Sequence, residues 1–241
     1  MHKIAISPEA HALAVRQRGG ALHMFETVDL GRTAHVVVDM QNGFMEVGAP
    51  VEVPCARDIV DQINAISAAV RQGGGVNVFL RMTATPESLT SWSNWFRYFH
   101  NPASTAGMLE AFAPGAHHWS LWPALDVQDA DVKVEKTRFG AFVPGASNLH
   151  EVLQARGPSL PPIDTLIITG TLTNCCCEST ARDAMQMNYK LIFVADANAA
   201  LTDAAHNGTL DNMCMLFADV MTTDEVLGVI GRSKVALQAA E

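Results

Sequence analysis

TLIITGTLTNCCCESTARDAMQM, residues 165–187, is the stretch that decides the fold of this chain. Its first, largely β-branched run stops at Gly170 and predicts a strand, and residues 178–187 predict a helix after a short polar turn. In open α/β folds the turn between a strand and the next helix lies at the carboxyl edge of the sheet, where ligands bind. Three consecutive cysteines occupy this turn, at 175–177. A helix N-terminus favours thiolate over thiol, so we expect a nucleophile here.

The composition indicates one globular unit with a large core, because 49% of the 241 residues are apolar and 17% are charged. A net charge of -9 and a pI near 5.4 argue against nucleic acid or an anionic membrane as partner and favour a small uncharged or cationic ligand. Residues 1–20 lack a signal-peptide pattern, and no later run is long enough to span a membrane. We therefore expect a soluble cytoplasmic protein whose five cysteines are reduced.

Apolar runs and helical periodicity alternate along the chain. The runs predict six strands, at residues 34–38, 76–82, 131–135, 166–169, 191–195 and 218–221. Amphipathic spacing predicts helices between them, at residues 56–72, 145–156, 178–187, 202–217 and 224–230. Strands that alternate with helices pair in parallel through right-handed crossovers, with helices on both faces. The sequence therefore predicts a three-layer α/β/α fold with a mostly parallel, about six-stranded central sheet.

Two segments lie outside this alternation. Residues 1–32 are weakly periodic and are interpreted as an N-terminal arm, lying on the domain of residues 33–241 or on a neighbouring subunit. Residues 85–108 are rich in aromatic side chains and are interpreted as core packing, a lid or a subunit contact. We expect a homo-oligomer, either a dimer or a tetramer.

Three chemically capable residues follow buried strands. Asp39 ends the run at 34–38, Lys136 follows the strand at 131–135, and a cysteine near 176 follows the strand at 166–169. In a parallel sheet all three converge on one edge. A carboxylate can take a proton from a thiol, and a lysine beside both stabilises the charged forms. The alternative for Asp39 is that it only caps a turn.

These residues also carry a resemblance to a known family. The segments VVVDMQNGF (36–44), KTRFGAF (136–142) and TGTLTNCCCESTARDA (169–184) resemble the isochorismatase-like cysteine hydrolases, and the similarity extends roughly over residues 33–230. That family includes nicotinamidases, N-carbamoylsarcosine amidase and ureidoacrylate amidohydrolases. The resemblance implies a Cys-Asp-Lys triad in which Asp39 is the base, Lys136 assists, and Cys176 attacks a carbonyl carbon.

Helical geometry gives an independent reason to choose among the three cysteines. Successive helical residues point about 100° apart, so at most one thiol faces a given pocket. Cys177 shares a face with Ala181 and Ala184, which suits burial against the sheet. Cys175 lies in the preceding turn, which leaves Cys176 as the expected nucleophile.

The resemblance has further implications for the site. It implies a non-proline cis peptide between Thr171 and Leu172, and an oxyanion hole formed by the backbone N–H groups of Leu172 and Cys176. The expected reaction is hydrolysis of a small amide, carbamoyl or ureido substrate through a thioester, without a cofactor. Aromatic side chains that could line the substrate pocket, or serve only in packing, are Phe44, Trp95, Phe139 and Phe142.

Departures from the family pattern narrow the expected activity. Nicotinamidase-like members bind a metal through an Asp and two His after the second strand, and residues 81–86 (RMTATP) lack them. True isochorismatases lack the nucleophilic cysteine. The metal-free amidase and carbamoyl hydrolase branch is therefore the expected one. His117 and His118 form the other metal-like pair, but no further ligand stands near them in sequence, so we interpret them as surface or structural histidines.

Two other classes of function compete with this interpretation. A redox or metal-binding thiol protein requires spaced cysteines such as CxxC, and residues 175–177 are consecutive. A catalytically silent, oligomeric small-molecule-binding protein on the same fold is the second alternative, and it does not explain why Asp39, Lys136 and Cys176 occur together.

Overall fold

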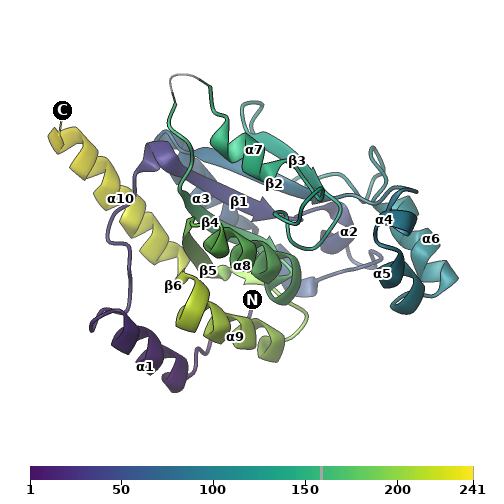
Figure 1. The fold of residues 1–241 in the computed structure, drawn as a ribbon, viewed down its shortest axis with the longest axis horizontal. Coiled ribbons are helices and arrows are strands. Elements are labelled where there is room, and N and C mark those ends of the chain that lie inside the picture. The colour runs from purple at the N-terminus through teal and green to yellow at the C-terminus, as the bar shows by residue number, and fades with distance from the viewer. Residues whose placement is uncertain (158–159, 241) are drawn as a thin grey trace.

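The computed structural model describes residues 1–157 and 160–240 and contains one six-stranded sheet. All strands are parallel, in the order β3-β2-β1-β4-β5-β6. The predicted three-layer α/β/α fold is confirmed (Figure 1). The strands are β1 (Thr33–Val38), β2 (Val76–Met82), β3 (Val132–Lys136), β4 (Thr165–Thr171), β5 (Lys190–Ala199) and β6 (Asp219–Met221).

The two central strands are buried along their whole length, which explains why β-branched and apolar residues predominate in both. β1 and β4 pair in register from Thr33 opposite Thr165 to Val38 opposite Gly170. Gly170 has a φ of +118°, and a Cβ atom there would lie 2.2 Å from the Val38 carbonyl oxygen. Only glycine therefore permits this close approach of the strands that carry the candidate site.

Helices cover both faces of the sheet (Figure 1). α3 (Val60–Gln72) and α10 (Thr223–Ala240) contribute Ile63 and Val229 to the core on one face. On the other face Leu153, Ala184 and Leu210 join a second core cluster. They come from α7 (Leu149–Gln154), α8 (Glu178–Gln186) and α9 (Asp203–Asn212).

Several predicted helices begin or end elsewhere. The predicted helix at 56–72 starts as the 3₁₀-helix η2 (Pro54–Ile59), and the one at 202–217 ends in the π-helix η4 (Met213–Phe217). The predicted helix at 145–156 is confined to α7, and α10 continues well past residue 230. The remaining short elements are η1 (Leu30–Arg32), α2 (Asn42–Met45) and the π-helix η3 (Thr173–Cys177).

The N-terminal arm contains a helix that the sequence pattern did not predict, α1 (Pro8–Gln17). Ser7 caps it by accepting a hydrogen bond from the Ala10 N–H, and Pro8 occupies its first turn. The arm lies on its own domain, because the Arg18 guanidinium donates to the carbonyl oxygens of Cys214 and Ala218. Figure 1 shows α1 beside α9.

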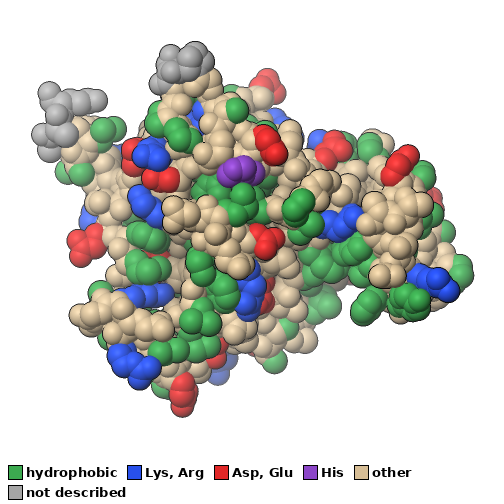
Figure 2. All heavy atoms as spheres, in the orientation of Figure 1, with side chains coloured by type: hydrophobic (Ala, Val, Ile, Leu, Met, Phe, Trp, Pro, Cys, Tyr) green, Lys and Arg blue, Asp and Glu red, His purple; other side chains and the backbone are tan. Residues whose placement is uncertain are grey.

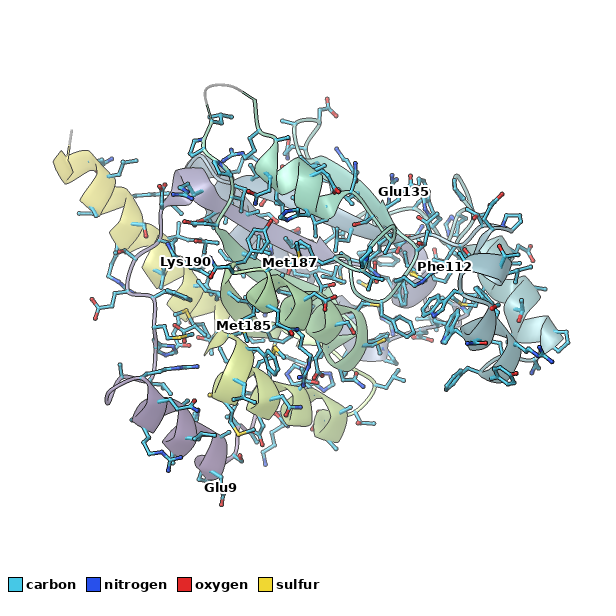
Figure 3. The ribbon with its side chains drawn as sticks, viewed as in Figure 1. Glu9, Phe112, Glu135, Met185, Met187 and Lys190 are labelled. Carbon is cyan, nitrogen blue, oxygen red and sulfur yellow. The ribbon has the colours of Figure 1, made fainter. Side chains whose placement is uncertain are left out.

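The aromatic segment forms three short helices, α4 (Ser88–Ser91), α5 (Ser93–Tyr98) and α6 (Pro102–Ala111). They project beyond the sheet on the side toward which β1 points (Figure 1). The buried ring of Phe112 lies at the junction between this segment and the rest of the domain (Figure 3). Tyr98 and Phe99 are exposed.

The surface carries charges of both signs. Figure 2 shows Lys, Arg, Asp and Glu side chains interspersed across one face, with no large area of a single sign. Among the described residues, no helix combines the length and the apolar character that crossing a lipid bilayer requires.

Candidate active site

Three of the predicted site residues meet at the carboxyl edge of the sheet. Asp39 directly follows β1, Lys136 is the last residue of β3, and Cys176 lies in η3, which follows β4. Lys136 Nζ is 2.6 Å from Asp39 Oδ2, and neither side chain has any exposed surface. Cys176 is 3% exposed and lies close enough that both charged groups act on its pKa.

The backbone at Asp39 is itself unusual. Its φ of +49° lies in the left-handed region, which Asp and Asn adopt more readily than most other residues. The Asp39 N–H still donates to the Leu80 carbonyl oxygen of β2, at 3.2 Å. The chain therefore turns sharply within one residue of the strand end and keeps the carboxylate at the sheet edge. Such conformations are concentrated at functional sites.

Lys136 is held by two contacts besides its ion pair. Its ammonium donates to the Arg138 carbonyl oxygen at 3.1 Å and lies 3.8 Å from the Met82 sulfur. Burial alone would lower the pKa of Lys136, but the Asp39 carboxylate beside it raises that pKa above its ordinary value. Lys136 is therefore the cationic partner of Asp39 in this site.

The pKa of Asp39 is raised, because burial disfavours the carboxylate more than Lys136 stabilises it. The pKa of Cys176 is raised well above its ordinary value by its hydrogen bond with the Cys175 thiol and by burial, while Lys136 acts in the opposite direction. For Cys176 this direction is opposite to the expected preference for thiolate at the helix start. Its thiol lies beside the Asp39 carboxyl group.

The neighbouring cysteines have different surroundings. Cys175 is half-buried, and its hydrogen bond with Cys176 lowers its pKa. Cys177 is fully buried in the same core cluster as Ala181 and Ala184, and burial raises its pKa well above the ordinary value. Cys177 thus occupies the core position that helical facing predicts.

The turn before the cysteines is fixed by its backbone. The Leu172 carbonyl oxygen accepts from the N–H groups of Cys175 and Cys177, at 3.1 Å each. The peptide bond between Thr171 and Leu172 is cis. The turn is also held by Thr173, whose Oγ1 lies 2.9 Å from His206 Nδ1.

His206 is a residue near the site that the sequence analysis missed. It is fully buried in α9, and the ring of His2 from the N-terminal arm stacks on it at 4.4 Å between centroids. Burial lowers the pKa of His206 to about 4, so the ring is neutral near pH 7. Neither histidine stands in a recognisable motif, so the sequence offered no signal for this contact.

The four candidate pocket residues fall into different groups. The ring of Trp95 meets Phe139 edge-on at 5.7 Å, and Trp92 contacts both. Phe44 instead packs against Phe112, and Phe142 packs against Tyr189. A surface pocket of about 560 Å³ adjoins Phe139, and its walls include Trp92, Arg138, Ser179 and Arg182.

His117 and His118 have a third potential ligand close by, which the sequence analysis did not foresee. Glu46 Oε1 lies 2.7 Å from His117 Nε2, and Glu46 Oε2 lies 3.5 Å from His118 Nε2. Glu46 is 71 residues away from His117 in the chain, so spacing alone could not reveal it. By contrast, Arg81, near the end of β2, stacks on Trp119 and pairs with Glu135.

Comparisons with known proteins agree with this architecture. The chain is 30% identical to a ureidoacrylate amidohydrolase of Variovorax paradoxus, over 91% of this chain and 87% of that one. It is 29% identical to a crystal structure of a cysteine hydrolase from Pseudomonas syringae pv. phaseolicola, with a TM-score of 0.73 over 88% of this chain and 98% of that one.

A second solved structure gives the same result. An isochorismatase-like hydrolase from Alkaliphilus metalliredigens is 27% identical, with a TM-score of 0.65 over 87% of this chain and all of that one. The family model described as the isochorismatase domain matches residues 33–225, from the first residue of β1 into α10. This chain therefore belongs to the isochorismatase family of hydrolases.

Proposed function

We propose that this protein is a cysteine-dependent amidohydrolase that cleaves a C–N bond of a small amide, carbamoyl or ureido substrate through a thioester. The observation that carries the proposal is the buried Asp39–Lys136 ion pair with the Cys176 thiol beside it. The similarity to ureidoacrylate amidohydrolases supports the choice of bond.

The first half of the reaction forms the thioester. Asp39 accepts the proton of the Cys176 thiol, and the sulfur attacks the substrate carbonyl carbon to give a tetrahedral intermediate. When the C–N bond breaks, the proton on Asp39 passes to the departing nitrogen, which leaves as ammonia or an amine. Asp39 is then a carboxylate again, and the acyl or carbamoyl group is bonded to sulfur.

The second half returns the enzyme to its starting state. Asp39 takes a proton from water as the water oxygen attacks the thioester carbon. The C–S bond breaks, the sulfur recovers the proton from Asp39, and the product leaves as an acid. Lys136 keeps its positive charge throughout. It stabilises the Asp39 carboxylate, the Cys176 thiolate and the tetrahedral intermediate, each of which is negatively charged.

The backbone N–H groups of Leu172 and Cys176 are the proposed oxyanion donors. Each such donor stabilises the transition state by about 3 kcal/mol. The N–H groups of Cys175 and Cys177 are unsuitable, because both already donate to the Leu172 carbonyl oxygen. The rings of Trp92 and Phe139 line the surface pocket described above and are the proposed apolar wall for substrate, with Trp95 packed behind them.

A panel of small amides, N-carbamoyl amines and ureido acids tests the proposal by ammonia release. Hydroxylamine is added to a parallel series, because an acyl thioester transfers its acyl group to hydroxylamine and yields a hydroxamate, or a hydroxyurea from a carbamoyl group. We expect ammonia release with at least one class and partition toward the hydroxylamine product. Turnover without any such product contradicts the thioester. The absence of turnover across the panel contradicts the substrate class.

A further inference from the structure

We infer that Glu46, His117 and His118 form a binding site for a divalent transition metal, with Zn²⁺ as the best-matched ion. The three side chains offer two imidazole nitrogens and one carboxylate oxygen, and their ligand atoms all lie within 4.8 Å of one another. Two histidines and one carboxylate, with one position left for water, are a common zinc ligand set. The inference does not depend on the proposed function.

The distances suit a tetrahedral ion. Zinc bonds of about 2.0–2.2 Å to nitrogen and oxygen imply ligand atoms about 3.3 Å apart at a tetrahedral centre. Glu46 Oε1 lies 2.7 Å from His117 Nε2 and Glu46 Oε2 lies 3.5 Å from His118 Nε2, so each histidine faces one of the two carboxylate oxygens. Binding of an ion requires the His117 ring and the carboxylate to separate from hydrogen-bonding distance to that spacing.

The backbone that carries these ligands is already fixed. The His118 carbonyl oxygen accepts from the Gly43 N–H at 2.9 Å, and the His117 carbonyl oxygen accepts from the Asn42 side chain at 3.0 Å. Glu46 follows α2 directly, and its own N–H donates to the Asn42 carbonyl oxygen. The ligands thus come from two segments that are bonded to each other without a metal, so little conformational entropy is lost on binding.

The site is accessible to an ion from solvent. The exposed fractions of the His117, His118 and Glu46 side chains are 67%, 32% and 33%. His117 and His118 line a surface pocket of about 420 Å³ with Glu110, whose carboxylate adds negative charge. A bound cation there would be partly shielded by α6, which contributes Gly107, Glu110 and Ala111 to the same wall.

A metal at this position would join α2 to the loop at 117–120 by coordination bonds. α2 begins three residues after Asp39, and Gln41 between them donates to the Trp119 carbonyl oxygen at 2.8 Å. A bound metal would therefore stabilise the segment that follows Asp39. It would not contact Asp39, Lys136 or Cys176 directly. We expect its main effect to be on stability.

Zinc titration of the full-length, tag-free, chelator-treated protein tests the inference by calorimetry. We expect one equivalent to bind and the thermal midpoint of unfolding to rise with zinc. Replacing His117 or His118 by Ala, or Glu46 by Gln, should weaken zinc binding at least tenfold and abolish the rise. Glu46→Gln retains a hydrogen-bond acceptor for His117, so it separates loss of a ligand from loss of the fold. His11→Ala, a histidine on α1, is the matched control and should bind like the parent.

Cobalt substitution distinguishes this site from the cysteines. A Co²⁺ spectrum with tetrahedral ligand-field bands and no thiolate charge-transfer band is expected. A thiolate band, or unchanged zinc affinity in the His117, His118 and Glu46 variants, overturns the inference. Failure to bind one equivalent also overturns the inference and leaves these three side chains as a hydrogen-bonded surface cluster.

Discussion

Lys136 Nζ lies 2.6 Å from Asp39 Oδ2, and both side chains are completely buried. Each charge is removed from water and depends on the other for compensation. The pair joins the end of β1 to the end of β3 across β2, which lies between them in the sheet. It is therefore both a structural tie and the electrostatic centre of the proposed site.

Lys136→Met is predicted to destabilise the protein and to inactivate it. Removing the ammonium leaves the Asp39 carboxylate buried without a cation, which costs about 3–5 kcal/mol of unfolding free energy or forces Asp39 to take up a proton. A protonated Asp39 cannot accept the thiol proton. Denaturant unfolding and amide hydrolysis measure the two effects.

The double variant Asp39→Asn with Lys136→Met separates the effect on stability from the effect on hydrolysis. It removes both buried charges, so we expect stability close to that of the parent while hydrolysis remains absent. If the single Lys136→Met variant keeps parental activity, the proposed role of the ion pair is wrong.

Single replacement of each cysteine by serine is predicted to affect hydrolysis unequally. Cys176→Ser should lower kcat by about a thousandfold or more, because a serine hydroxyl is a far weaker nucleophile here. Cys177→Ser should mainly lower stability, since it places a hydroxyl in the core. Cys55→Ser, at the half-buried cysteine of η2, serves as the matched control and should retain most activity, whereas Cys175→Ser removes a hydrogen-bond partner of Cys176. An active Cys176→Ser enzyme would refute the assignment.

Activity is predicted to fall on the acidic side through the raised pKa of Asp39. Burial raises the pKa of this carboxyl above the ordinary value of 3.8, and the base form is the unprotonated one. Activity is therefore present above the raised pKa and lost as the pH falls through it. The measurement is kcat/KM against pH with an uncharged amide, after a check that the fold persists. A rate that increases toward acid contradicts this role for Asp39.

Much of the fold was predictable because parallel strands buried on both faces consist of apolar runs. β1 and β4 were predicted from the sequence for that reason. The helices of the aromatic segment were not, because α4 and α5 are short and their rings do not recur at helical spacing. α1 was missed because its cap and its two buried alanines give only a weak periodic signal. β5 extends to Ala199, past Asp196, the polar residue that suggested the end of the predicted strand at 191–195.

The site was predictable only in part. Asp39, Lys136 and Cys176 could be located because each stands at a strand end or in the turn that follows one, where topology fixes the neighbourhood. Protonation was not predictable, because the raised pKa of Cys176 depends on burial and on the orientation of the Cys175 thiol. Glu46 and His206 were missed because their contacts are made across the fold, with partners distant in sequence.

The buried His35 side chain is predicted to lower the free energy of unfolding as the pH falls. Burial lowers its pKa to about 3, and its ring nitrogens lie near Ser67 Oγ and Thr169 Oγ1. Between pH 6.5 and 4 the unfolded chain binds a proton that the folded protein does not, so the free energy of unfolding falls as the pH is lowered. The contribution is about 1.4 kcal/mol per pH unit, or about 3 kcal/mol over this range.

Denaturant unfolding at several pH values measures this contribution against a His35→Gln variant. The variant keeps hydrogen-bonding capacity but cannot titrate, so its dependence on pH should be shallower. His11→Gln, on α1, should behave like the parent. Equal slopes for the parent and His35→Gln would show that this ring does not contribute.

Gly170→Ala is predicted to lower the unfolding free energy by roughly 3 kcal/mol or more, through its positive φ and the contact with the Val38 carbonyl oxygen. Gly107→Ala is the control, because a Cβ there meets open space within α6. That variant should be unchanged or stabilised by about 0.5–1 kcal/mol. If both variants lose comparable unfolding free energy, the close approach of β1 and β4 at Gly170 is not the cause of the destabilisation.

The strand order also has a consequence for biosynthesis. β4 pairs directly with β1, although β2 and β3 lie between them in the chain. As the polypeptide leaves the ribosome, one side of β1 stays without a partner until residues 165–171 emerge, and an apolar strand left open in this way is prone to aggregate. Nascent chains that stop before β4 should therefore require a chaperone and should lack all hydrolytic capacity.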